Sequence, residues 1–112
     1  MAAALDQATA RISSSFADQP EAEPEMRTAL NIAEQAYPEG GPGVAGYQSF
    51  LGRVLAARRR FSGAEPLLIA AYDAHLEAYG AENQGTAAAA ASLVDLYDAW
   101  GRPDDAARYR QD

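Results

Sequence analysis

The sequence predicts an all-α domain made of antiparallel helix–turn–helix units. Three observations lead to this fold class. The chain is rich in alanine, and its 9 basic residues are all arginine, two residue types that favour helices, whereas strand formers are scarce. A segment recurs after a fixed interval along the chain, and glycine and proline stand where one helical pattern ends and the next begins. The length of 112 residues suits one domain.

The repeat has a period of 42 residues. Ala22-Glu23-Pro24 recurs at this interval as Ala64-Glu65-Pro66. Because alanine is abundant and inflates chance matches, the more informative equivalences are those of rarer residues: Pro24 with Pro66, Tyr37 with Tyr79, and Leu51 with Leu93. We therefore expect an opening helix within residues 1–20, a first unit over 21–63, and a second unit with a terminal helix over 64–112.

Helices are expected over about 3–16, 21–37 and 44–58 in the first half of the chain. The opening helix would carry its apolar residues on one side, at Leu5, Ala8, Ile12 and Phe16. The glycine- and proline-rich segment 38–43 separates the next two helices.

The second unit has clearer helix boundaries. Ser62 and Glu65 form a capping-box pattern, with Pro66 expected in the first turn of a helix that stops at Gly80. The next helix is expected to begin near Thr86 and to end at Gly101, and a short helix follows from Pro103. The prediction totals about six helices.

Charge and composition restrict the partners. The net charge of −7 disfavours nucleic acid and anionic membranes as general partners. The chain has no cysteine, which removes disulfides, thiolate catalysis and cysteine-bound zinc. The N-terminal residues lack a basic flank and a long apolar stretch, so we expect no signal peptide and a cytoplasmic location.

Two segments resemble the tetratricopeptide repeat family. One is Leu51-Gly52-x-x-Leu55 followed by Phe61-x-x-Ala64-x-x-x-Leu68-x-x-Ala71, and the other is Leu93-Val94-x-x-Tyr97 with Gly101 and Ala106. The 42-residue unit is similar to the longer variety found in kinesin light chains and many bacterial proteins. The resemblance implies a short right-handed solenoid whose first helix in each unit lines a concave groove.

A narrower resemblance concerns the repeat region of large bacterial serine/threonine protein kinases. It rests on Phe16-x-x-Gln19-Pro20-x-x-Glu23-x-x-Met26-Arg27 and on Leu93-Val94-x-Leu96-Tyr97-x-Ala99-Trp100-Gly101-Arg102-Pro103. Kinase activity does not carry over, because the chain has no lysine and therefore cannot supply the lysine that pairs with the phosphates in a kinase. The chain departs from the repeat pattern at Arg59, where glycine is usual, and at Gln48, where a large apolar residue is common.

No residue set indicates catalysis, a cofactor or a metal, so the chain is not expected to be an enzyme. His75 is the only histidine, and no second ligand stands at a standard spacing from it. The segment 13–15 is a serine run without the strand–turn–helix setting of a catalytic elbow, and the segment 40–43 lacks the lysine of a phosphate loop. Trp100 and Tyr109 are expected to pack around the last turn.

The arginine run 58–60 admits two interpretations. Cations next to a helix C-terminus are stabilising, by about 0.3–1 kcal/mol. The alternative is a basic patch that meets an acidic partner or acidic surface of another copy.

The resemblance assigns four residues to the inner groove: Ser49, Arg53, Asp95 and Asp98. Arg53 and Asp95 are equivalent positions of the two units. They could pair with each other across the groove, or both could recognise an extended peptide that carries a basic residue. The expected function is a non-catalytic scaffold that binds a protein or peptide in this groove. The alternative is a structural remnant or regulatory appendage of a longer kinase array, which self-associates through its end helices.

Overall fold

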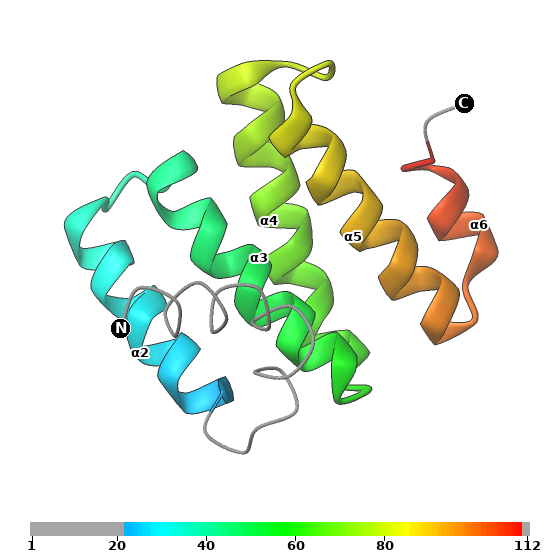
Figure 1. Ribbon diagram of the computed structural model, residues 1–112, viewed down its shortest axis with the longest axis horizontal. Helices are drawn as coiled ribbons and strands as arrows, with labels where there is room; N and C mark the ends of the chain where they lie inside the picture. The colour runs from blue at the N-terminus through cyan, green and yellow to red at the C-terminus, as the bar shows by residue number, and fades with distance from the viewer. Residues whose placement is uncertain (1–21, 111–112) are drawn as a thin grey trace, which may run out of the picture.

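The computed structural model describes residues 22–110, and this part of the chain forms helices and turns with no strand. Consecutive helices run antiparallel, joined by short connections (Figure 1). The helices are α2 (Ala22–Ala36), α3 (Pro42–Ala57), α4 (Phe61–Tyr79), α5 (Gln84–Trp100) and α6 (Pro103–Ala107). The all-α prediction is therefore confirmed for these residues, whereas the opening helix expected at 3–16 lies outside them.

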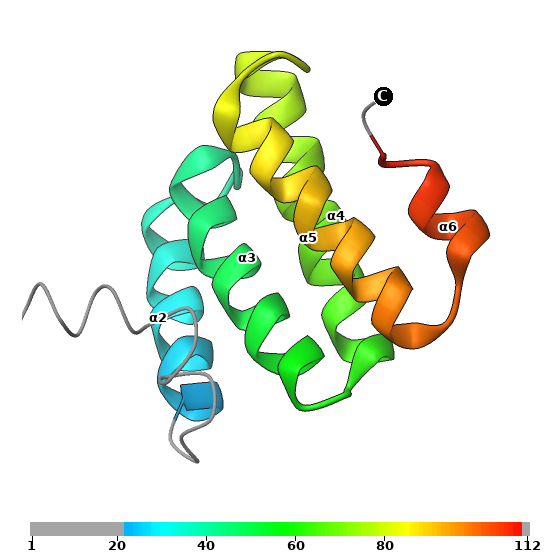
Figure 2. The same ribbon diagram turned by 45° about the vertical axis from the view of Figure 1, so that its right-hand side comes forward.

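Helix α3 and helix α4 form the most extensive contact, and α4 also packs on α5. Helix α2 covers α3, and the short α6 lies against α5 (Figure 2). Helices α3 and α5 also touch each other, although α4 separates them along the chain. This arrangement places the two helices expected to carry the binding residues side by side.

The core forms where α3, α4 and α5 meet. Leucines supply most of its volume, and each fully buried leucine contributes roughly 1.5–3 kcal/mol of hydrophobic stabilisation. Gly52 permits the close approach of α3 to α4, since a Cβ atom there would lie 2.7 Å from the Leu68 Cδ2 atom. The leucines that are at most 2% exposed are Leu51, Leu55, Leu68, Leu93 and Leu96.

The turns between paired helices agree with the repeat. Arg59 has φ 61°, and Gly101, its equivalent 42 residues later, has φ 78°. Both therefore adopt the left-handed backbone that glycine tolerates best. The prediction that Arg59 occupies a glycine-like turn position is confirmed.

The capping-box prediction is wrong. Helix α4 begins at Phe61, and Arg60 stands at the cap position without a side-chain hydrogen bond. Ser62 is thus inside the helix, and Pro66 lies in its second turn rather than its first. Glu65 does not cap the helix; it accepts a hydrogen bond from the Tyr97 hydroxyl at 2.6 Å. Glu65, which the local pattern assigned to the cap, thus forms a contact between α4 and α5 instead.

The other helix starts differ slightly from the prediction. Helix α3 begins at Pro42, where the missing N–H of proline costs no helical hydrogen bond. Helix α5 begins at Gln84 because Asn83 caps it, accepting a hydrogen bond from the Gly85 N–H at 2.7 Å. Gly80 and Gly101 end α4 and α5 as expected.

Aromatic side chains fill the space between α4, α5 and α6. Trp100 stacks on Phe61, with ring centroids 5.7 Å apart. Tyr109 lies 5.3 Å from Tyr72 in an edge-to-face arrangement and 6.1 Å from Tyr97. The prediction that Trp100 and Tyr109 pack around the last turn is confirmed.

Among the described residues, no helix is both long and apolar enough to cross a membrane.

Candidate binding surfaces

The four residues predicted to bind a ligand come from two neighbouring helices. Ser49 and Arg53 lie on α3, and Asp95 and Asp98 lie on α5. Ser49 is half-buried, whereas the other three residues are exposed. Since α3 and α5 touch, a ligand that lies across both helices can reach residues from each.

Arg53 and Asp95 do not form the predicted pair. Within residues 22–110, no ion pair joins Arg53 to Asp95 or to any other carboxylate. Both side chains are exposed, so each is accessible to a partner.

Asp98 has a partner that the sequence reasoning missed. The Arg110 Nη2 atom donates to both carboxylate oxygens of Asp98, at 2.9 Å and 3.0 Å. No periodic signal identifies this contact, because Arg110 lies beyond the last helix and reaches Asp98 only through the packing of α6 on α5. Of the two aspartates, Asp95 is therefore the one that forms no ion pair within the described part of the chain.

The side chains of the arginine run 58–60 make contacts within the protein. Glu23, at the start of α2, accepts a hydrogen bond from the Arg60 Nη1 atom at 2.7 Å, and the Arg58 Nη1 atom lies 3.8 Å from the same oxygen. Arg27 donates to the second oxygen of Glu23 at 3.1 Å. The side chain of Glu23 is only 15% exposed. Arg58 and Arg60 thus hold α2 to the turn between α3 and α4, whereas Arg27 contacts the same carboxylate from within α2.

Two further arginines cover aromatic rings at this same end of the molecule. The Arg59 guanidinium carbon lies 5.2 Å from the centre of the Phe61 ring. That of Arg102 lies 3.8 Å from the Trp100 ring. Since Phe61 stacks on Trp100, the two turns are joined by an arginine–ring–ring–arginine stack. Its signal in the sequence is an aromatic residue two positions from an arginine in each turn.

Tyr97 is buried at 1% exposure, and its hydroxyl contacts Glu65. Burial raises the pKa of Tyr97 above its ordinary value, and the hydrogen bond to Glu65 and its negative charge raise it further. The tyrosine is therefore a neutral donor that links α4 to α5. The Tyr97 hydroxyl thus has a structural role, in its hydrogen bond to Glu65.

His75 also makes a local contact. Its Nδ1 atom lies 2.8 Å from the Ala71 carbonyl oxygen, and its ring packs closely on Gly85 at the start of α5. In the described part of the chain, no group of three histidine, aspartate or glutamate side chains is arranged to hold a metal ion.

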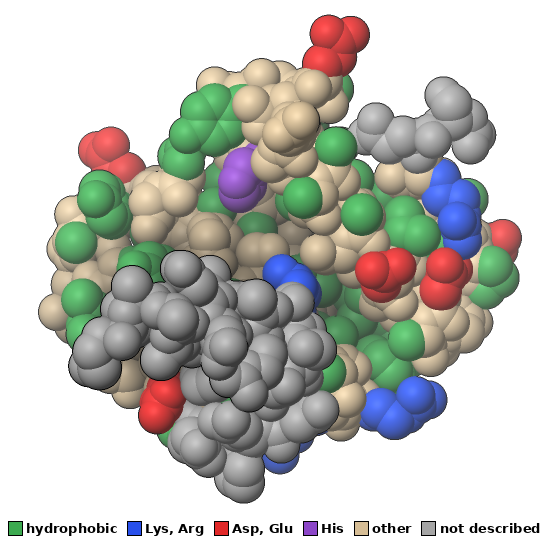
Figure 3. Space-filling view, in the orientation of Figure 1, with side chains coloured by type: hydrophobic (Ala, Val, Ile, Leu, Met, Phe, Trp, Pro, Cys, Tyr) green, Lys and Arg blue, Asp and Glu red, His purple; other side chains and the backbone are tan. Residues whose placement is uncertain are grey.

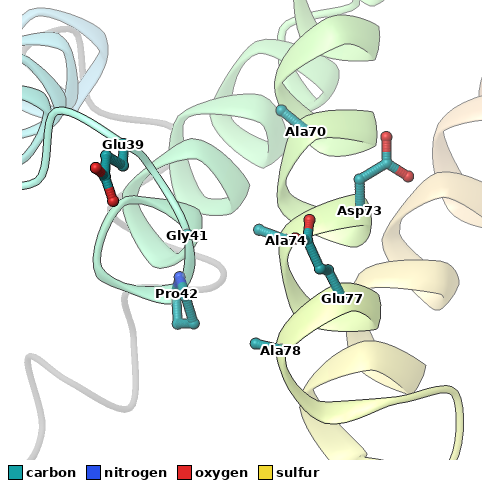
Figure 4. A pocket seen from close by; sticks show the side chains of 8 residues that line it. All are labelled: Glu39, Gly41, Pro42, Ala70, Asp73, Ala74, Glu77 and Ala78. Atoms are coloured by element: carbon teal, nitrogen blue, oxygen red, sulfur yellow. The ribbon is translucent and has the colours of Figure 1, made fainter.

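A hollow of about 470 Å³ opens between the α2–α3 loop and the second half of α4. Figure 4 shows the methyl groups of Ala70, Ala74 and Ala78 turned towards Pro42 across this hollow. Its carboxylates come from both sides, with Glu39 on the loop and Asp73 and Glu77 on α4. The remaining lining residue is Gly41.

No protein-family model, no curated protein and no solved structure matches this chain. The assignment of function therefore rests on the residues and their arrangement.

Proposed function

We propose that this protein is a non-catalytic scaffold that binds an extended segment of a partner protein across α3 and α5. The observation that carries the proposal is the pair of exposed charges at equivalent positions of the two units. Arg53 and Asp95 come from adjacent helices, and neither forms an ion pair within the described residues.

The proposal includes the architecture. We propose tetratricopeptide-type repeats of 42 residues in a short right-handed solenoid. Support comes from the equivalent left-handed turns at Arg59 and Gly101 and from the contact between α3 and α5, which are equivalent helices of the 42-residue repeat. In such an arrangement the shared face of these helices is the groove.

The charges select the ligand. A basic side chain of the partner meets Asp95, and a backbone carbonyl or an acidic side chain meets Arg53. Asp98 contributes less, because binding there competes with its two hydrogen bonds from Arg110. Ser49 is half-buried and offers a hydroxyl to the backbone of the segment.

Selection from a random peptide library on the immobilised protein tests the proposal. We expect the selected peptides to be enriched in arginine or lysine. Asp95→Arg is expected to weaken them by roughly 1.5–3 kcal/mol, the size of one hydrogen-bonded charged contact. Glu25→Arg is the control, since it makes the same charge change at an exposed position on α2. Equal affinities of the folded Asp95→Arg variant and the wild-type protein would exclude the groove.

A further inference from the structure

The exposed large hydrophobic side chains of the described residues gather in two short stretches of the chain. They are Ile32, Tyr37, Tyr47, Leu76 and Tyr79, each at least 37% exposed. These stretches flank the α2–α3 loop and the α4–α5 connection, which lie at the same end of the molecule in both ribbon views (Figures 1 and 2). We call the surface formed by residues 32–47 and 73–82 the acidic end.

The same surface carries carboxylates without cations. No arginine occurs in residues 28–52 or 61–101, so His75 is the only basic side chain of the acidic end. Within the described residues, no ion pair includes any of its carboxylates. In Figure 3, carboxylates and hydrophobic side chains occur together towards the upper left, and no arginine is visible among them. The carboxylates are Glu34, Glu39, Asp73, Glu77 and Glu82.

At the opposite end of the protein, charges are paired and aromatic rings are covered by other residues of the chain. There, arginines surround Glu23 and cover the rings of Phe61 and Trp100. One end thus satisfies its charges and covers its aromatic rings from within the chain. The acidic end has neither arrangement, and the hollow beside α4 opens on it. Exposed apolar side chains in such a setting mark an interaction surface.

We propose that the acidic end docks a segment of a partner protein in which basic residues alternate with apolar ones. Arginine and lysine suit the hollow because their aliphatic stems can pack on the methyl groups of Ala70, Ala74 and Ala78 while the charge meets Glu39 or Glu77. The apolar residues of the segment cover exposed side chains such as Ile32 and Leu76. This surface is separate from the groove across α3 and α5, so the protein has two binding surfaces.

A fluorescent synthetic peptide that alternates arginine and leucine tests the proposal by anisotropy with the full-length protein. We expect saturable binding that weakens with added salt, since exposed charges are screened. Replacing every arginine of the peptide by citrulline, or every leucine by serine, is expected to abolish saturable binding. Retention of binding by the citrulline peptide would contradict the assigned charge complementarity.

Variants of the protein locate the site. Glu39→Arg and Glu77→Arg are each expected to weaken the peptide roughly two- to fivefold, the range for exposed charge pairs. Leu76→Ser is expected to weaken it by a similar factor. Glu25→Arg, the control with the same charge change at the other end of α2, is expected to change the affinity less than either of them. Circular dichroism verifies that each variant is folded.

Three results would overturn the proposal. Equal losses in Glu25→Arg and Glu77→Arg would show non-specific attraction of the peptide to an acidic protein. A loss in Asp95→Arg without one in Glu77→Arg would place the peptide in the groove across α3 and α5. A sedimentation mass that rises with concentration, and that Ile32→Ser returns to the monomer, would show that the acidic end binds a second copy instead.

Discussion

Arg59 and Gly101 occupy equivalent turns with nearly the same left-handed backbone, at φ 61° and φ 78°. A non-glycine residue in this conformation costs roughly 1 kcal/mol. In the first turn this cost is offset in part by the Arg59 guanidinium over Phe61, a contact worth about 0.5–1 kcal/mol when exposed. Arg59 thus offsets part of the cost of its left-handed backbone through its own contact with the Phe61 ring.

Arg59→Gly is therefore expected to raise the melting temperature only slightly. The same substitution in a Phe61→Leu background is expected to raise it more, because there is no ring contact left to lose. Thermal unfolding of the four proteins in this cycle measures the coupling, which we expect at about 0.5–1 kcal/mol. Lower stability of Arg59→Gly in both backgrounds would contradict the strain argument.

Thr86 is fully buried, and its hydroxyl has no hydrogen-bond partner among the described residues. Its equivalent in the first unit is Val44, an apolar residue of the same shape that is 2% exposed. Thr86→Val is expected to stabilise the protein by about 1–3 kcal/mol, the cost of a buried unsatisfied group. Urea unfolding measures the change, and Val44→Thr is expected to lower the stability. A loss of stability in Thr86→Val would show that the hydroxyl is satisfied.

Gly52 and Gly46 lie on the same helix but in different surroundings. A Cβ atom at Gly52 would approach Leu68 to 2.7 Å, whereas one at Gly46 would meet no atom within 4 Å. Gly52→Ala is expected to cost roughly 1–3 kcal/mol through overpacking. Gly46→Ala is expected to stabilise the helix by up to about 1 kcal/mol. Chemical denaturation compares the two, and equal effects would mean that the contact between α3 and α4 is loose at Gly52.

The hydrogen bond from Tyr97 to Glu65 links α4 to α5. Tyr97→Phe removes it and leaves the partly buried Glu65 without this donor. We expect a loss of about 1.5–3 kcal/mol in the free energy of unfolding at neutral pH, the range for a hydrogen bond to a charged group. Leu96→Met, a near-isosteric change beside it in the core, is the control for general disturbance of packing, at under about 1.5 kcal/mol.

The raised pKa of Tyr97 predicts a dependence on alkaline pH. The unfolded tyrosine loses its proton near the ordinary pKa of 10.0, whereas the folded one keeps it to higher pH. The stabilisation is therefore complete below pH 10 and is lost as the pH rises towards the raised pKa of the folded state. Urea unfolding across this window is expected to show a steeper loss for the wild-type protein than for Tyr97→Phe. Parallel curves would contradict the burial of an ionisable hydroxyl at this position.

The positions of the helices depend on local chemistry, so the amino-acid sequence was enough to predict them. Helical periodicity, the glycines at 80 and 101, and Pro103 place the helices to within a few residues, because neighbours along the chain decide where a helix forms and ends. The 42-residue repeat correctly identified Arg59 as a turn residue. The exposure of Arg53 and Asp95 was expected from the resemblance to a repeat family, and the repeat itself predicted only that their positions are equivalent.

The pairing of charges, in contrast, depends on how the described helices pack against one another. Glu23 meets Arg60, 37 residues away, and Asp98 meets Arg110 after the chain has turned back. Glu65 likewise does not form the helix cap that its local pattern predicts; it accepts a hydrogen bond from Tyr97. Such contacts depend on how the helices pack, since an ion pair needs its atoms within a few ångströms, whatever their spacing in sequence. Packing therefore determines that arginines close one end of the protein, whereas the other end presents exposed apolar side chains beside carboxylates that form no ion pair within residues 22–110.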